Sequence, residues 1–250
     1  MILSFSQYLN ESEENIVRFA KDLAHKVSNK IKNQKLDPDS NTYFSPARIE
    51  IADLYKIDVI LHIKKNTNPD FKTDSHFSDL NWEKYNFNEK GFAIDATIRM
   101  NKSDKYVPEL TFHVIVDPNR EPSVYNDLYA RLVDILVHEI NHIDQAGINQ
   151  NPFNNAPEEQ SHRKKSEKSY RYFLLRDEME SMIEGFHARA EIEDIPLDYI
   201  FIDYLQPFVL SKFINSEEYH DVLERWIKHA VERYPNAKFS QQAQKIINSL

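Results

Sequence analysis

Residues 123–146 carry the strongest structural signal in the chain, an uninterrupted amphipathic helix pattern. Apolar side chains recur there every three or four positions, the spacing that places them on one face of a helix. They are Val124, Leu128, Leu132, Ile135, Leu136 and Ile140, and Gly147 follows where a helix commonly ends. We therefore predict a long helix whose apolar face the rest of the fold must cover.

The segments around this helix have patterns of their own. Helical spacing is found before it over residues 12–33 and after it from Asp177 to about Ile195. Strand patterns, rich in β-branched residues or alternating in polarity, occupy residues 56–63, 92–100 and 110–116, whereas residues 66–88 and 148–169 are polar and are expected to be irregular. Residues 197–250 are helical in pattern throughout. This order predicts an α+β fold with a small sheet.

The long helix contains the sequence His138-Glu139-Ile140-Asn141-His142, an H-E-x-x-H pattern. Positions four apart lie on the same face of a helix, so His138 and His142 can direct two imidazoles to one metal ion. Glu139 lies one step round the helix, where it would reach a water on the metal rather than the metal itself. The alternative is a pair of partly buried histidines with no ligand role.

A catalytic zinc site needs a third protein ligand and leaves one position for water. The chain has no cysteine, so a thiolate is excluded, and with it the ligand set of peptide deformylase. The metzincin extension needs glycine at position 145 and histidine at position 148, where this chain has Gln145 and Ile148. A carboxylate from a following helix remains, and residues 177–186 contain several.

With that arrangement the chain resembles a gluzincin metallopeptidase, in which one helix carries H-E-x-x-H and the next carries a ligand Glu. In those enzymes a further acidic residue, one turn after the ligand, often orients a metal-bound histidine. Glu180 and Glu184 are four apart, so we choose Glu180 as the third ligand, with Glu184 accepting an N–H from one histidine. Glu178, which has Met182 one turn on, is the alternative ligand. Such ligands suit Zn²⁺.

The resemblance implies zinc-dependent hydrolysis of peptide bonds, by an endopeptidase or a limited processing protease. Glu139 would then serve as the general base. Tyr172 resembles the Tyr that precedes the Glu helix in lethal-factor-like members, so we expect it to donate a hydrogen bond to the developing oxyanion. Tyr170, His162 and His187 compete for that role.

In zincins the strand before the active helix commonly pairs with extended substrate. The resemblance therefore implies that residues 110–116 bind a protein or peptide by strand addition, although an ordinary core strand fits equally well. His113 within this strand is expected to be a sheet residue rather than a ligand. The other histidines are interpreted as non-functional: His25, His62, His76, His220 and His229.

Composition and charge limit the classes of function. A formal net charge of −9 over 250 residues argues against a nucleic-acid binder. Only three glycines occur, too few for a Gly-rich phosphate-binding loop, which argues against ATPase and dinucleotide chemistry. No stretch is long and apolar enough to predict a membrane span, and residues 1–6 lack the pattern of a secretory signal, so a cytoplasmic protein is expected.

Two short segments carry weaker signals. Residues 5–11 resemble the amphipathic leaders of proteins from T4-like tailed phages, with Leu9-Asn10-Glu11 like the L-x-E sites cut by their prohead protease. That resemblance implies a place in the host cytoplasm or the virion, although a plain helix start explains the residues as well. Arg163-Lys164-Lys165, with Lys168 and Arg171, form a basic cluster. Such a cluster usually indicates a solvent-exposed loop. The alternative is that it attracts an acidic substrate.

Together these patterns predict a zincin-like metallopeptidase domain over residues 1–196, with a helical C-terminal region, residues 197–250, packed on it. The main alternative is a structural or interaction protein, virion-associated if the chain is of phage origin, with a zincin fold and a non-catalytic metal site. A second alternative is a regulatory or toxin-like metalloprotein that acts on one host target. The sequence leaves the oligomeric state open.

Overall fold

The computed structural model describes residues 5–33, 42–51, 55–67, 82–100, 108–146, 166 and 169–248. Its helices are α1 (Phe5–Asn33), α2 (Trp82–Lys90), α3 (Val124–Ala146), α5 (Arg176–Glu193), α6 (Leu197–Leu210), α7 (Ser216–Arg233) and α8 (Gln241–Ile247), with the short 3-10 helix η3 (Tyr170–Leu174) before α5. Its strands are β1 (Thr42–Ile51), β2 (Tyr55–Lys65), β3 (Phe92–Met100) and β4 (Pro108–Val116). The α+β prediction is confirmed. No helix in these ranges has the length and apolar character needed to cross a bilayer.

The described strands form one mixed sheet in the order β1-β2-β4-β3. β2 and β4 are parallel, whereas β1 and β3 run antiparallel to their neighbours. The strands predicted over residues 56–63, 92–100 and 110–116 are all present, the first and third slightly longer than expected. β1 and α2 were missed, because residues 42–47 lack a clear alternation and residues 66–88 read as polar and irregular.

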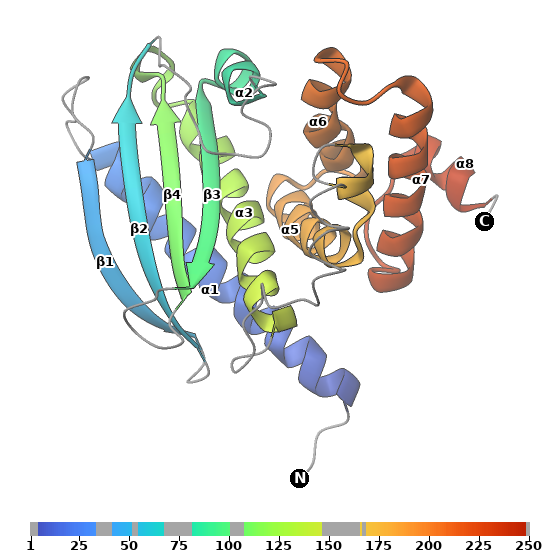
Figure 1. Cartoon of the computed structure of the whole chain (residues 1–250), viewed down its shortest axis with the longest axis horizontal. Coiled ribbons are helices and arrows are strands. Elements are labelled where there is room, and N and C mark those ends of the chain that lie inside the picture. The colour runs from blue at the N-terminus through green and yellow to red at the C-terminus, as the bar shows by residue number, and fades with distance from the viewer. Residues whose placement is uncertain are drawn as a thin grey trace.

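β4 lies inside the sheet. Its backbone pairs with β2 over residues 109–116 and with β3 over residues 108–116. The prediction that residues 110–116 bind substrate by strand addition is therefore wrong, since the hydrogen-bonding groups on both sides of that strand are already used. Among the described strands, β3 forms the edge of the sheet nearest α3 (Figure 1).

Helices α1 and α3 pack together and cover one face of the sheet (Figure 1). The predicted stripe of α3 is the face that is buried, with Leu128, Leu132 and Leu136 fully inaccessible to solvent. Burial of each such side chain stabilises the fold by roughly 1.5–3 kcal/mol. The phage-like residues 5–11 form the first turns of α1, and their side chains lie outside the described part of the structure.

Helices α5 to α8 and η3 build a second apolar cluster on the other side of α3 (Figure 1). Trp226 lies at its centre with no exposed surface, and its indole Nε1 donates a hydrogen bond to the carbonyl oxygen of Phe173 at 2.8 Å. α5 belongs to both clusters, since Ala188 packs with the sheet layer and Phe186 packs with Trp226. The boundary at residue 196 remains a prediction.

Gly185 marks the point where α5 crosses α3. A Cβ atom at this position would lie 2.4 Å from the carbonyl oxygen of Asp134 and 2.7 Å from its Oδ1. Only a residue without a side chain allows the two helices to approach this closely. Asp134 is one helical turn before His138, so this contact brings α5 against the part of α3 that carries the H-E-x-x-H pattern.

Candidate metal centre

His138 and His142 of α3 and Glu178 of α5 bring three potential ligand atoms together. The two histidine Nε2 atoms are 3.1 Å apart, and the Oε2 atom of Glu178 lies 3.7 Å from that of His138 and 3.4 Å from that of His142. The imidazole rings meet edge to face, with centroids 4.6 Å apart. All three side chains therefore point at one small volume between α3 and α5.

The spacing of these three atoms fits a zinc ion. Bonds of about 2.05 Å in a tetrahedral arrangement place any two ligand atoms about 3.3 Å apart. The observed separations of 3.1, 3.4 and 3.7 Å bracket that value. The residues present thus fit a divalent cation held by two imidazoles and one carboxylate.

The carboxylate that lies with the two histidines is Glu178 and not Glu180, the residue predicted as the third ligand. Glu178 is only 1% exposed and faces the histidines, whereas the side chain of Glu180 is 29% exposed and accepts a hydrogen bond from Arg176 at 2.7 Å. Residues two positions apart in a helix are separated by about 200° around its axis, so the carboxylates of Glu178 and Glu180 point in nearly opposite directions.

The role predicted for Glu184, accepting an N–H from one of the two histidines, stays a prediction. Glu184 accepts a hydrogen bond from the side-chain amide of Asn141 and lies 3.5 Å from Nη2 of Arg233. The hydroxyl of Ser181 lies 3.4 Å from the Nδ1 atom of His142. Ser181 is three residues after Glu178 on the same face of α5, so it can orient the imidazole in the way expected of Glu184.

Tyr172 does lie at this centre, as part of η3. Its hydroxyl donates a hydrogen bond of 2.8 Å to Oε2 of Glu178, the same oxygen that faces the two histidines. A buried carboxylate is costly unless hydrogen bonds or a cation compensate it, and this hydroxyl compensates part of its charge. The contact ties Tyr172 to the third ligand; its predicted role as an oxyanion donor remains a prediction.

Glu139 lies beside the ligand group on α3. Burial, together with the negative charges of Glu178 and of Asp95 on β3, raises the pKa of Glu139 to about 8, against the opposing effect of His142. At neutral pH a carboxyl group with this pKa is mostly protonated, whereas a general base must be ionised. A cation bound nearby would act in the opposite direction and lower this pKa.

Tyr204 of α6 lies within electrostatic range of Glu178 and Glu139 and was not among the residues singled out from the sequence. Burial, with smaller contributions from the carboxylates of Asp134, Glu178 and Glu139, raises its pKa. No local pattern marks this residue, because α6 reaches the centre only through tertiary packing. Ser181, by contrast, could have been found from its spacing to Glu178 once the correct ligand was known.

The other candidates lie elsewhere or outside the described residues. His187 stacks on Tyr234 with ring centroids 3.9 Å apart, and Tyr170 packs against the second apolar cluster. His113 is exposed on β4 and stacks on His62, as expected of a sheet residue. His162, His76 and the basic residues Arg163, Lys164, Lys165 and Lys168 fall outside the described residues.

Comparisons of the chain with protein-family models, with curated proteins and with solved structures found no match. The function is therefore inferred from the chemistry of the site itself.

Proposed function

We propose that this chain is a zinc-dependent peptide hydrolase of the gluzincin type, with His138, His142 and Glu178 as the metal ligands and Glu139 as the general base. The observation that carries the proposal is the convergence of three potential ligand atoms at zinc-like spacing, with the carboxyl group of Glu139 at the adjacent helix position. A purely structural zinc site has no need of that fourth residue.

The chain's own residues account for the proton transfers. A zinc ion held by His138, His142 and Glu178 would supply Lewis-acid activation of water and of the scissile carbonyl. Glu139 accepts the proton of the attacking water and passes it to the leaving amine. Tyr172 holds Glu178 in place through its hydrogen bond and would donate to the oxyanion that develops on the substrate.

β3 is the element best placed to bind the peptide. It ends the described sheet on the side of α3, it packs against α3, and its Asp95 acts on the pKa of Glu139. An extended peptide that pairs with the outer side of β3 would run past the metal centre. This replaces β4 as the proposed strand for substrate addition.

The proposal departs from the gluzincin pattern at one position. One turn after the ligand Glu178 stands Met182, which is buried, where those enzymes often have an acidic residue. Ser181 lies against His142 instead. A hydroxyl is a weaker acceptor than a carboxylate, so we expect lower zinc affinity than a carboxylate at that position would give.

Metal analysis of purified variants tests the assignment. We expect about one zinc per chain in the wild type, and loss of zinc in His138→Ala and Glu178→Ala. Glu180→Ala is the matched control, a carboxylate on the same helix that should leave the zinc content unchanged. Glu139→Gln should keep the zinc and abolish cleavage of a mixed peptide library, scored by mass spectrometry.

Two outcomes would overturn parts of this assignment. Zinc retained by Glu178→Ala and lost from Glu180→Ala would restore the original choice of ligand. Stoichiometric zinc in the wild type, with no cleavage of any peptide or of a denatured protein mixture, would favour the alternative of a structural or interaction protein with a non-catalytic metal.

A further inference from the structure

Helix α5 lies between α3 and α7, and one carboxylate of α5 contacts both of its neighbours (Figure 1). Oε2 of Glu184 accepts a hydrogen bond from the side-chain amide of Asn141 on α3. Oε1 of Glu184 lies 3.5 Å from Nη2 of Arg233 on α7. We call Asn141, Glu184 and Arg233 the carboxylate bridge, because the two oxygens of one side chain connect α3 with α7.

The bridge reaches α3 inside the H-E-x-x-H pattern. Asn141 directly precedes His142 and is only 6% exposed. A buried amide that loses its partner costs free energy, so the side chain of Asn141 keeps its orientation as long as Glu184 accepts its N–H. This contact fixes how the last turns of α3 are rotated toward α5. It thereby fixes the direction in which the backbone presents the imidazole of His142.

The other end of the bridge is held by the packing of α7 on α5. Arg233 is in the last turn of α7, where a cation is favoured by the helix dipole. The next residue, Tyr234, stacks on His187 of α5 with ring centroids 3.9 Å apart. His187 lies three residues after Glu184, about one helical turn, so this stack holds the end of α7 beside the carboxylate.

A second contact from α7 reaches the opposite side of the metal centre. The indole of Trp226 donates its hydrogen bond to the carbonyl oxygen of Phe173 in η3. Phe173 follows Tyr172, whose hydroxyl donates to Oε2 of Glu178. Trp226 and Arg233 are seven residues apart, close to two helical turns, so they lie on the same face of α7. One face of α7 therefore supports both α3 and the carboxylate of the candidate centre.

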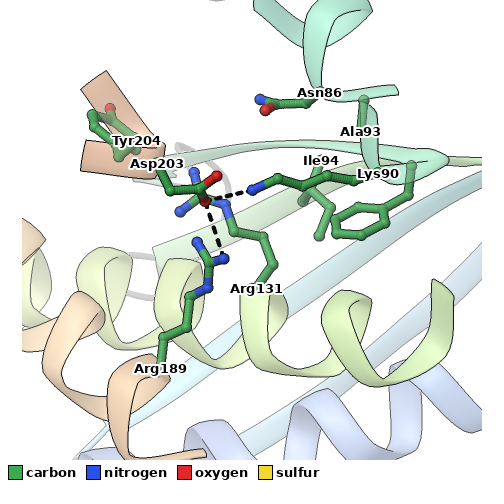
Figure 2. Close-up of a pocket in the computed structure, with 9 residues that line it drawn as sticks. Asn86, Lys90, Ala93, Ile94, Arg131, Arg189, Asp203 and Tyr204 are labelled. Carbon is green, nitrogen blue, oxygen red and sulfur yellow. Dashed lines mark hydrogen bonds and ion pairs between the residues drawn. The ribbon is translucent and has the colours of Figure 1, made fainter. Parts of the chain in front are cut away.

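The far end of α5 is held by a separate network of ion pairs (Figure 2). Arg189 pairs with Asp203 of α6, and the ammonium of Lys90 from α2 pairs with the same carboxylate. Arg189 lies about three turns, or roughly 16 Å, beyond Glu178 along α5. A change in this network disturbs the packing of α5 without touching the carboxylate bridge, which makes it a useful comparison.

We propose that α7 positions the metal ligands, and that Glu184 is the positioning residue through which it acts on α3. Arg233 fixes the carboxylate of Glu184, and that carboxylate fixes Asn141 beside His142. The proposal rests on the proposed function for the metal itself. The imidazoles and Glu178 can still meet without the bridge, so we expect weaker zinc binding rather than its complete loss.

The zinc affinity of the full-length chain, measured by competition with a chromophoric chelator, tests the bridge without requiring cleavage. Glu184→Ala should bind zinc about tenfold more weakly, the lower end of the effect of removing a ligand's support. Arg233→Met should bind about threefold more weakly, as for a partly exposed ion pair. Arg225→Met is the matched control, because Arg225 pairs with Asp221 within α7 and is 62% exposed.

A conservative variant separates the two contacts of the carboxylate. Glu184→Gln keeps an oxygen that can accept from Asn141 and removes the charge that pairs with Arg233. Its zinc affinity should therefore match that of Arg233→Met and exceed that of Glu184→Ala. If Glu184→Ala fails to fold by circular dichroism, the comparison of Glu184→Gln, Arg233→Met and Arg225→Met decides.

A double-mutant cycle distinguishes action through Asn141 from a general loss of structure. Asn141→Ala should also bind zinc about tenfold more weakly. The double variant with Glu184→Ala should lose little more, since two residues that act through one contact are not additive. Asp203→Asn weakens the network at the far end of α5 and should leave the zinc affinity unchanged.

Three results would overturn the proposal. They are an unchanged zinc affinity in Glu184→Ala, a loss in the double variant equal to the product of the single losses, and an equal loss of affinity in Asp203→Asn. Cleavage of peptides is scored separately. The expected differences in affinity without cleavage support the bridge and remove the proposed hydrolase, whereas cleavage with full affinity in Glu184→Ala does the reverse. A wild type that binds no zinc removes both.

Discussion

Substitution of Gly185 by alanine should lower both the stability of the fold and the affinity for zinc. In most helix interiors the same change stabilises a protein, since alanine is the better helix former by about 1 kcal/mol. Here the new Cβ atom would lie 2.4 Å from the carbonyl oxygen of Asp134, and separations below 3.0 Å are not tolerated. The opposing atom belongs to the backbone of α3, so it cannot rotate away.

The magnitude follows from these two effects. Overpacking of a buried contact costs typically about 1–3 kcal/mol, against the gain of about 1 kcal/mol in helix propensity. We therefore expect a net loss of about 1 kcal/mol in the free energy of unfolding of the zinc-free chain. The direction of this change is the informative result, because replacing an ordinary helical glycine by alanine raises the free energy of unfolding.

The effect on zinc follows from the displacement of α5. Relief of the clash moves α5 away from α3 by more than half an ångström at Gly185. Glu178 is seven residues earlier on the same face and moves with the helix. Protein ligands to zinc tolerate deviations of about 0.2 Å, so we expect the affinity to fall at least tenfold, the lower end of the effect of disturbing a ligand's support.

Urea denaturation with a chelator present measures the stability, and competition with a chromophoric chelator measures the zinc affinity. Gly91→Ala is the control: Gly91 has φ of +78°, so alanine there is strained by about 1–2 kcal/mol, but the turn lies away from the α3–α5 crossing. Unchanged stability and zinc affinity in Gly185→Ala would refute the close crossing. Equal losses of affinity in both variants would mean that zinc binding follows overall stability.

Three further predictions concern the whole fold. Removal of zinc by a chelator should lower the thermal midpoint of the wild type and leave that of Glu178→Ala unchanged. If free zinc starts at 100 times its dissociation constant, the loss in the wild type corresponds to about 2.7 kcal/mol of stability. Trp226→Phe should cost about 1–3 kcal/mol in urea denaturation, because the buried carbonyl of Phe173 loses its donor; a loss below the experimental error would contradict this. The cations around Asp203 lower its pKa, so the stability that these ion pairs confer is fully present above the unfolded pKa of about 4. That stability is lost as the pH falls through the lower pKa of the folded state, and the difference in stability between the wild type and Asp203→Asn should shrink over the same range. A difference that does not depend on pH would count against the ion pairs.

The elements with regular apolar spacing were predictable from the sequence. α3 and β3 agree with the expected ranges to within one residue, because burial of one face imposes a period that the sequence carries openly. α2 was missed because only Phe87 of its residues is fully buried in the described part of that helix, so no stripe exists to detect. α2 is attached instead through Lys90, which pairs with Asp203 of α6, a partner far away in the sequence.

The two histidines of the candidate metal centre were predicted from the sequence, whereas its carboxylate was missed, for a physical reason. H-E-x-x-H is a local pattern, and one helix suffices to bring its side chains together. The carboxylate belongs to a second helix, and which of its faces meets α3 is a property of helix packing. The spacing of Glu180 and Glu184 is compatible with the helix α5, but it does not indicate which face of that helix is turned toward α3.

That rotation is nevertheless recorded in the sequence, at the one glycine of α5. Glycine in a helix interior costs about 1 kcal/mol relative to alanine, so its presence there calls for a close neighbour. Gly185 must then face the adjacent helix, and seven residues are close to two helical turns, so Glu178 shares its face while Glu180 does not. Taken as a mark of the contact face, Gly185 would have selected Glu178 from the sequence alone. Glu178 and Gly185 should therefore be tested together, because the close approach of α3 and α5 at Gly185 also sets the distances from Glu178 to His138 and His142.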